Sequence, residues 1–401
     1  MWKIKKETGL AVIVLGAGTL LAGIVGLFAY VTFTAIPLHP DSGGLPSVMR
    51  STPAPKWSGA VDQARLVVRS GITEQNLPGV SVAVGVGGEI VWAEGFGFAD
   101  LDTRVPVAPE MRFRIAEVSK AFTSAAVGLL LEQQKLNLDD EIQTYVPEYP
   151  KKEWPVTLRQ LMAQTAGVRE DSGDEEPLHE RCDRTIDALP RFARSSLRFE
   201  PGTKFSPSSY GWILVSAAVE AVARERFFSV LRAQVFEPLG MRDTRPDLTF
   251  VETVPDLVTF YFPRFGGDTR YGPESVREGD HSCTAGATGF LSTASDVVRF
   301  GMAMSAGKLL QPSTIALLQT PVRLPSGEET GYGLGWTVET LPLGGQPTRM
   351  AGHGTKKDFI GGSAYLMTFP ERGLAVAVTT NISFADAKSI AAKVADAFAG
   401  Q

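Results

Sequence analysis

The chain has 401 residues, of which 44% are hydrophobic and 21% charged. This composition is sufficient for a sizeable core in one large or two ordinary domains. The formal net charge is −5 and there is no basic block, so charge gives no reason to expect nucleic-acid binding. Prolines and glycines follow no period, and repeats are therefore not indicated.

The N-terminal part of the chain contains a long apolar run. Residues 9–36 carry no charged side chain, and Lys3, Lys5 and Lys6 precede them. The apolar core of a signal peptide is about 7–15 residues long, whereas a membrane-spanning helix needs about 20. We therefore expect an uncleaved single-pass transmembrane signal anchor over 9–36. Its lysines and the whole of 1–8 would be cytoplasmic, and the rest exported, on the periplasmic side of a bacterial inner membrane.

Two features of the sequence concern assembly. Gly18, Ala22 and Gly26 form a row of small residues in the apolar run, which leaves helix association and a homo-oligomer open. An exported domain permits a disulfide between Cys182 and Cys283, but we expect two separate thiols because the cysteines lie far apart in sequence. The histidines show no metal-ligand spacing, and we expect neither a metal nor another cofactor.

The folded domain is expected over 57–401, after a linker at 37–56 that is rich in proline, glycine and serine. It begins with helical periodicity at 57–70. Two alternating segments around a Gly-Gly turn then predict a β-hairpin, with strands at 79–86 and 89–98.

From about 113 to 240 the pattern becomes helical, with short connections. Thr157 is a plausible N-cap, and an acidic, loop-like segment covers 171–180. The expected helices are 121–134, 157–165 and 209–224.

The C-terminal part returns to strands and ends in an amphipathic helix. Strands are expected at 331–339, 361–369 and 373–380, and the helix at 384–398. The fold class is therefore α+β. An antiparallel sheet assembled from N- and C-terminal segments is flanked by the terminal helices, and the mostly helical lobe is inserted between them. Ligands would bind where the lobe meets the sheet.

The first turn of the helix that begins near Ala121 is unusual. The helix is almost entirely apolar to Leu131, as expected of a buried helix, yet Lys120 stands at its start. A lysine fits there if the turn opens into a cleft. Serine–lysine acyl-transfer enzymes place such a lysine one helical turn after a nucleophilic serine.

Several further segments occur in the order of one known family. They are 95–100, 113–116, 136–140, 158–167, 200–205, 236–241, 289–293 and 361–363. On these segments the chain resembles the serine β-lactamase and penicillin-binding-protein superfamily, in its class C, D-alanyl-D-alanine peptidase and esterase branch. This branch includes mitochondrial serine β-lactamase-like proteins and their bacterial counterparts. The resemblance covers about 75–390 and implies a β-lactamase/transpeptidase-like fold and a hydrolase of peptidoglycan peptides, β-lactams or small esters.

All three motifs that carry the family's chemistry are altered here. The resemblance implies Ser-x-x-Lys, but Glu117 occupies the nucleophile place before Lys120. It implies a tyrosine at the place of Pro207. It also implies Lys-Thr-Gly or His-x-Gly beside the cleft, where this chain has His353-Gly354-Thr355, followed by about two extra residues around 356–358.

These alterations argue against the family's mechanism. A carboxylate is a poor nucleophile toward an amide, and Glu117 and Lys120 have the i, i+3 spacing of a helical ion pair. The pair stabilises the ammonium form of Lys120, which then cannot act as a base. Pro207 offers no hydroxyl. We therefore predict a non-catalytic binding or scaffold protein. The alternative is a weak hydrolase with an unorthodox nucleophile.

Other groups remain open as replacements. Ser119 points about 100° away from Lys120 on a helix, and Ser124 lies a turn deeper. Ser208 belongs to the altered second motif, and Glu117 itself has the chemistry of a general base toward water. The expected catalytic positions are Lys120, Glu117 and His353, the last as a proton carrier. The expected contacts to a small-molecule or peptide ligand are Ser209, Tyr210, Gly354 and Thr355.

Overall fold

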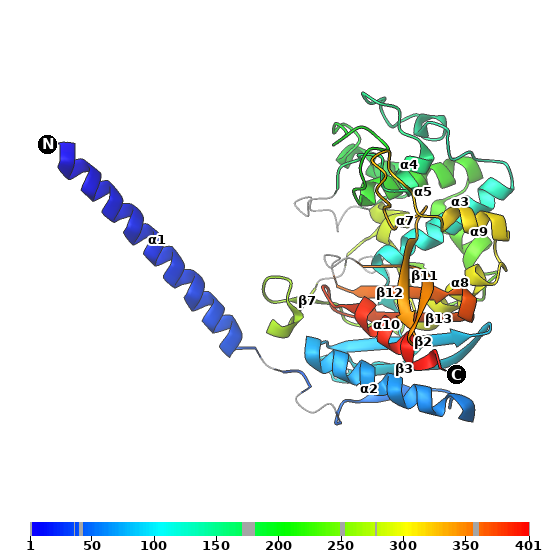
Figure 1. Ribbon diagram of the computed structural model, residues 1–401, viewed down its shortest axis with the longest axis horizontal. Helices are drawn as coiled ribbons and strands as arrows, with labels where there is room; N and C mark the ends of the chain where they lie inside the picture. The colour runs from blue at the N-terminus through cyan, green and yellow to red at the C-terminus, as the bar shows by residue number, and fades with distance from the viewer. Residues whose placement is uncertain are drawn as a thin grey trace.

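The computed structural model describes residues 2–35, 37–39, 43–170, 181–248, 253–276, 279–355 and 361–400. Helix α1 (Trp2–Phe33) projects from a folded body that contains the rest of the described chain (Figure 1). Within α1, residues Gly16–Phe33 are long and apolar enough to cross a membrane. The N-terminal helix that was predicted from the apolar run is therefore present.

A large antiparallel sheet forms the centre of the body, in the order β1-β3-β2-β13-β12-β11-β10, with β4 paired to β3. Its N-terminal and C-terminal parts join where β2 pairs with β13, from Val86↔Leu374 to Val80↔Thr380. This confirms the sheet predicted from both ends of the domain. The strands are β1 (Ser47–Met49), β2 (Gly79–Val86), β3 (Glu89–Asp100), β4 (Val105–Pro106), β10 (Thr337–Leu343), β11 (Gln346–Gly354), β12 (Ser363–Phe369) and β13 (Leu374–Thr380).

The predicted strand at 331–339 was wrong in its start, and β11 was not predicted. Gly331 and Gly335 have φ values of 64° and 95°, so the chain turns there before β10 begins. Strand β11 contains polar and glycine residues and is defined by pairing with β10 on one side and β12 on the other.

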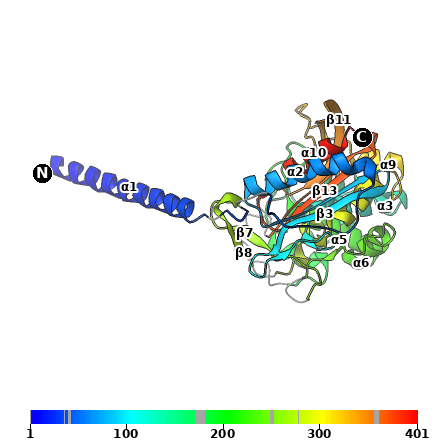
Figure 2. The same cartoon turned by 90° about the horizontal axis from the view of Figure 1, so that it is seen from below.

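Helices cover both faces of the sheet. The terminal helices α2 (Ser58–Gln75) and α10 (Ala387–Phe398) pack on one face, and α8 (Ala294–Ser305) packs on the other (Figures 1 and 2). The alternation of β2 serves both layers: Val82 lies in the core under α2 and α10, and Ala83 in the core that contains α8.

The α8 face of the sheet requires small residues. A Cβ atom added to Gly85 would lie 2.3 Å from the sulfur of Met302, which belongs to α8. The absence of a side chain at position 85 therefore lets the helix approach the strand.

The middle of the chain forms the helical lobe, as predicted. Thr157 caps α4 through a capping box: its hydroxyl accepts from the Gln160 backbone N–H at 3.2 Å, and its own N–H donates to the Gln160 side chain at 2.9 Å. Helix α4 is shorter than the predicted 157–165, since Gln164 has a left-handed φ of 58°. The acidic segment 171–180 lies outside the described residues. The lobe helices are α3 (Ser119–Glu132), α4 (Leu158–Met162), α5 (Ser209–Ala223) and α6 (Phe227–Leu231).

Smaller elements complete the body. A three-stranded sheet and a separate two-stranded hairpin follow α6, together with two further helices. These elements are β5 (Phe113–Arg114), β6 (Arg245–Pro246), β7 (Tyr261–Pro263), β8 (Pro273–Ser275), β9 (Phe290–Ser292), α7 (Ala285–Thr288) and α9 (Pro312–Leu318).

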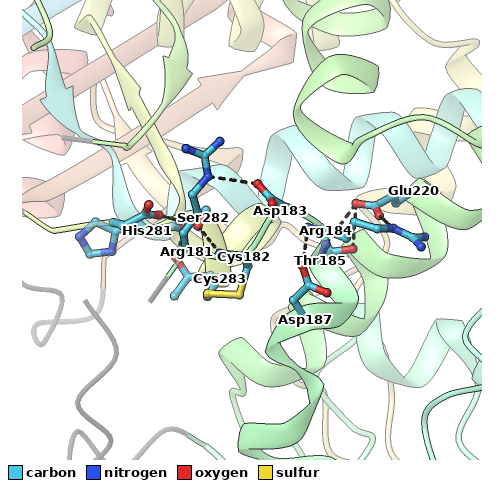
Figure 3. Close-up of a disulfide and its surroundings, with 12 residues drawn as sticks. Arg181, Cys182, Asp183, Arg184, Thr185, Asp187, Glu220, His281, Ser282 and Cys283 are labelled. Carbon is cyan, nitrogen blue, oxygen red and sulfur yellow. Dashed lines mark hydrogen bonds and ion pairs between the residues drawn. A yellow bond between two sulfur atoms is a disulfide. The ribbon is translucent and has the colours of Figure 1, made fainter. Parts of the chain in front are cut away.

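The expectation of two separate thiols was wrong, because Cys182 and Cys283 form a disulfide (Figure 3). The chain returns from the lobe so that their Cα atoms are 4.9 Å apart. The Cys182 N–H also donates to the Ser282 hydroxyl at 2.9 Å. Sequence distance alone does not show that the two segments lie side by side.

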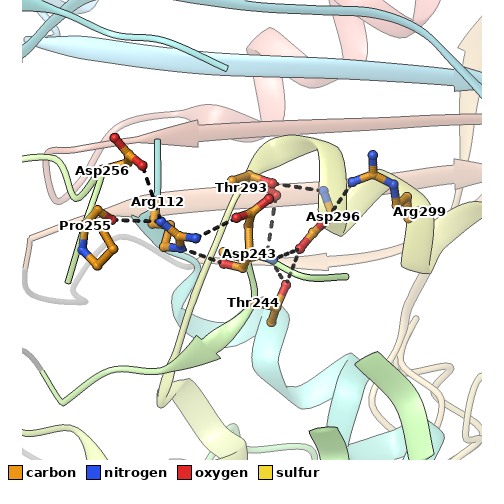
Figure 4. A network of polar contacts seen from close by, with 9 residues as sticks. Arg112, Asp243, Thr244, Pro255, Asp256, Thr293, Asp296 and Arg299 are labelled. Carbon is orange, nitrogen blue, oxygen red and sulfur yellow. Dashed lines mark hydrogen bonds and ion pairs between the residues drawn. The ribbon is translucent and has the colours of Figure 1, made fainter. Parts of the chain in front are cut away.

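A polar network joins the lobe side of the body to the sheet side (Figure 4). Arg112 donates to the Asp243 carboxylate at 2.5 Å, and the Asp243 N–H donates to Asp296 at 2.8 Å. Asp296 belongs to α8 and also accepts from Arg299 at 2.6 Å. Because Asp296 is fully buried, these donors stabilise its charge.

Candidate active site

Glu117 and Lys120 form an ion pair at the start of α3. Glu117 lies in a short 3-10 turn (Ala116–Val118) that leads directly into the helix. Lys120 Nζ donates to Glu117 Oε1 at 2.8 Å, and the two side chains are 1% and 16% exposed. The amine therefore lies behind the carboxylate, away from solvent.

The backbone just before Glu117 is strained. Ala116 is fully buried and has a φ of 46°, in the left-handed region that side chains rarely adopt. Surrounding structure must hold such a residue, and strain of this kind is typical of functional sites.

Glu117 opens onto a cavity of about 610 Å³ between the helical lobe and the sheet. This is the junction where the sequence predicts a ligand site. Beside Glu117, the cavity is lined by residues of the lobe, of strands β10 to β12 and of the lead into α10: Gln164, Pro207, Tyr332, Thr337, Glu339, His353, Gly354, Thr355, Tyr365, Phe384, Ala385, Asp386, Ala387 and Lys388.

Tyr332 connects the two sides of this cavity and was not found from the sequence. Its hydroxyl lies 2.8 Å from Nε2 of His353, and it also has a side-chain hydrogen bond with Gln164 of the lobe. Burial raises the pKa of the Tyr332 phenol well above its ordinary value. The bond from Gln164 lowers it, and the Glu117 carboxylate raises it. The phenol is therefore protonated at neutral pH and serves as a neutral hydrogen-bonding group.

The third altered motif lies on the cavity wall but uses its residues for packing. A Cβ added to Gly354 would lie 2.2 Å from the Tyr365 ring, so glycine is required by the neighbouring strand. The Thr355 hydroxyl accepts from the Ala364 N–H at 3.1 Å and thereby continues the pairing of β11 with β12. Residues 356–358, where the motif is longer than expected, lie outside the described residues.

At the second motif, Pro207 lines the cavity, and the hydroxyl that follows it is used as a helix cap. The Ser208 hydroxyl accepts from the Gly211 N–H at 3.1 Å and donates to the Arg169 carbonyl at 2.8 Å. It therefore satisfies the start of α5.

Ser209 and Tyr210 are not among the described residues that line the cavity. Tyr210 is 4% exposed and stacks on Phe192, with ring centroids 4.5 Å apart. The guanidinium of Arg169 lies 5.0 Å from the centroid of the Tyr210 ring. Tyr210 is thus a core aromatic of the lobe, and Ser209 is half-buried at the first position of α5.

The hydroxyls nearest to Lys120 in sequence have other environments. Ser124 donates to the Leu334 carbonyl at 2.5 Å. Ser119 is fully buried, and its hydroxyl has no hydrogen-bond partner within the described residues. Neither hydroxyl is hydrogen-bonded to the amine, whose bond goes to Glu117.

The opposite wall of the cavity carries a second ion pair. Lys388 of α10 donates to both carboxylate oxygens of Glu339 at 2.7 Å, and its Nζ lies 5.7 Å from the centroid of the Tyr365 ring. The cavity therefore combines paired charges with aromatic surface, a suitable lining for a ligand that has both polar and apolar parts.

Known proteins share both the sequence pattern and the fold. The human serine beta-lactamase-like protein LACTB, which is mitochondrial, is 26% identical over 451 residues, covering 86% of this chain and 81% of that protein. A D-amino acid amidase from Ochrobactrum anthropi superposes with a TM-score of 0.71 at 22% identity, covering 85% of this chain and 99% of the amidase. An octameric penicillin-binding protein homologue from Pyrococcus abyssi gives a TM-score of 0.70 at 22% identity, covering 85% and 78%.

A family model described as Beta-lactamase matches residues 64–400, which is nearly the whole folded body. The antiparallel sheet, the covering helices and the inserted lobe agree with this match. The chain belongs to the beta-lactamase family.

Proposed function

We propose that this protein is a membrane-anchored member of the family that binds a ligand in the 610 Å³ cavity without acyl transfer. The observation that carries this proposal is the ion pair between Glu117 and Lys120. An acid occupies the nucleophile position, and the amine that would serve as base is bonded to it. Pro207 removes the second expected hydroxyl from the same cavity.

The names of relatives suggest the class of ligand. The neighbours include a penicillin-binding protein homologue and a D-amino acid amidase. We therefore propose a short peptide or an amide-containing small molecule as the ligand. The backbone groups near Thr355 and the Tyr332–His353 pair would supply its hydrogen bonds.

The anchor and the location are proposed from two independent features. Gly16–Phe33 suits a membrane span, and the basic residues before it favour a cytoplasmic N-terminus. The Cys182–Cys283 disulfide supports an oxidising compartment such as the periplasm. A homo-oligomer is consistent with the octameric relative and remains part of the proposal.

The first experiment asks whether any nucleophile reacts. The full chain is incubated with a fluorescent penicillin and its intact mass is measured. Because no alcohol is bonded to Lys120, we expect an unmodified mass. A covalent adduct on the unaltered chain would contradict the non-catalytic proposal and support the alternative of an unorthodox hydrolase.

A second experiment asks whether the scaffold keeps the rest of the machinery. The double variant Glu117→Ser, Pro207→Tyr restores both expected hydroxyls, and we expect ester hydrolysis at least about 100-fold above the unaltered chain. The matched control adds Lys120→Met, which should remove the gain. If the control hydrolyses esters as fast as the double variant, the gain does not depend on the restored serine–lysine pair.

A further inference from the structure

The hairpin of β7 and β8, residues 261–275, lies against the end of α1 that is nearest to the body. Figures 1 and 2 both place it there. The Tyr271 ring packs edge-on against Phe28 of α1, with centroids 6.2 Å apart. Arg264 donates to the carbonyl and the hydroxyl of Thr34 at 3.3 and 3.0 Å. This contact leaves Val31 only 5% exposed.

The length of α1 sets the depth of this contact in a membrane, given the proposed anchoring. At about 1.5 Å per residue, the helical part of the apolar run, residues 9–33, is roughly 37 Å long. The hydrocarbon core is only about 30 Å thick. The hairpin presents polar backbone and a guanidinium, which cannot enter hydrocarbon without great cost. The excess helix must therefore lie on the hairpin side, in the headgroup layer.

The surface chemistry of the 261–275 hairpin suits this layer. Arg264 and Arg270 are exposed, and the half-buried rings of Phe265 and Tyr271 pack edge to face at 5.9 Å. Aromatic rings are enriched at membrane interfaces, and guanidinium groups bind phosphate. Arg270 is paired with Asp268 at 2.6 Å, and Glu274 is also exposed. The hairpin thus has no net formal charge and suits zwitterionic phospholipid as well as anionic lipid.

The other side of the hairpin is joined to the wall of the ligand cavity. The Tyr261 N–H donates to the Asn381 carbonyl at 2.8 Å, and the Ser383 N–H donates to the Tyr261 carbonyl at 3.1 Å. Phe262 packs edge-on against Phe384, which lines the cavity, with ring centroids 5.4 Å apart. The hairpin is therefore a short bridge between α1 and the cavity.

We infer that the 261–275 hairpin rests in the phospholipid headgroup layer and holds the ligand cavity beside the membrane surface. This inference rests on the proposed anchoring by α1. It assigns the hairpin a lipid partner, with Arg264 as the phosphate-binding residue. A ligand would then reach the cavity along the membrane surface.

The test places a nitroxide on the full chain in phosphatidylcholine nanodiscs. The label is attached at Arg270→Cys in the hairpin or, as the matched control, at Leu317→Cys on α9, which is 41% exposed. The native cysteines are bonded to each other and do not react. We expect collisions with a water-soluble nickel chelate to be roughly threefold less frequent at position 270 than at position 317, because headgroups exclude the chelate.

Two further arms separate the possible failures. Arg264→Glu should raise the chelate accessibility at position 270 toward the control value, whereas Arg264→Lys should not. Equal accessibility at 270 and 317, in discs that retain the chain, would overturn the inference and leave the anchor intact. Protection that appears only with phosphatidylglycerol would also overturn it, because that result indicates charge-driven adsorption. A chain that does not co-elute with the discs would contradict the anchor itself.

Discussion

At residue 117, a carboxylate changes what the neighbouring lysine does. Lys120 is almost completely buried, and a buried ammonium needs a partner because water cannot solvate it. Glu117 supplies that partner at 2.8 Å. The same contact that removes the base from chemistry therefore stabilises the start of α3.

This dependence can be measured with Glu117→Gln. The substitution leaves the Lys120 charge buried without its carboxylate, so we expect the free energy of unfolding to fall by about 3 kcal/mol in urea. The matched control is Glu110→Gln in the exposed pair with Arg50, where the loss should stay below about 1 kcal/mol. Equal losses for the two variants would show that the buried pair has no special role.

A buried histidine should make stability depend on pH. Burial lowers the pKa of His281 to about 4, against a smaller opposing effect of Asp247. The unfolded chain binds this proton near pH 6.5 and the folded chain does not, so stability is lost as pH falls from about 6.5 to 4. We expect His281→Gln to reduce the stability difference between pH 7.5 and 4.5 by about 2.5 kcal/mol. Unfolding in urea at both pH values checks this, and an unchanged difference would contradict it.

The individual residues of the site were predictable to different degrees. The Glu117–Lys120 pair follows from helical spacing, and the structure contains it. Tyr332 was not predictable from spacing, because its contacts with His353 and Gln164 form only when the lobe meets the sheet. For Tyr210, the sequence left open whether the ring packs in the core or faces the cleft, and its stacking on Phe192 is a tertiary contact.

Among the elements, those defined by local chemistry were predicted best. The Gly87-Gly88 turn sets the hairpin of β2 and β3, and Thr157 sets the start of α4. Strand β11 was missed because its state comes from two neighbouring strands and not from its own residues. The disulfide was missed for the same reason, as it joins two segments that only the fold brings together.

The disulfide should contribute strongly to the stability of the lobe. It closes a loop with a sequence separation of 101 residues, and removing such a link increases the entropy of the unfolded chain. We expect the double variant Cys182→Ser, Cys283→Ser to lose about 2–5 kcal/mol of unfolding free energy. Reducing agent should destabilise the unaltered chain and leave the variant unchanged. A variant as stable as the oxidised chain would contradict this expectation.

At the scale of the whole molecule, the architecture follows from how the chain is divided. Strands from both ends form one sheet, and the segment between them forms the lobe, so a ligand site arises at their junction. The sequence predicts that arrangement. It does not predict that the 261–275 hairpin contacts α1, since neither segment carries a signal for the other.

The orientation of the whole chain in a membrane is the remaining prediction. With Lys3, Lys5 and Lys6 kept in the cytoplasm, the body is exported. A single Leu317→Cys substitution, exposed on α9, should react with a membrane-impermeant maleimide in intact spheroplasts. Changing the three lysines to serine removes the charge bias at the N-terminus, and the labelled fraction should fall because some chains insert in the opposite direction. Labelling of the unaltered orientation only after detergent lysis would show that the body faces the cytoplasm.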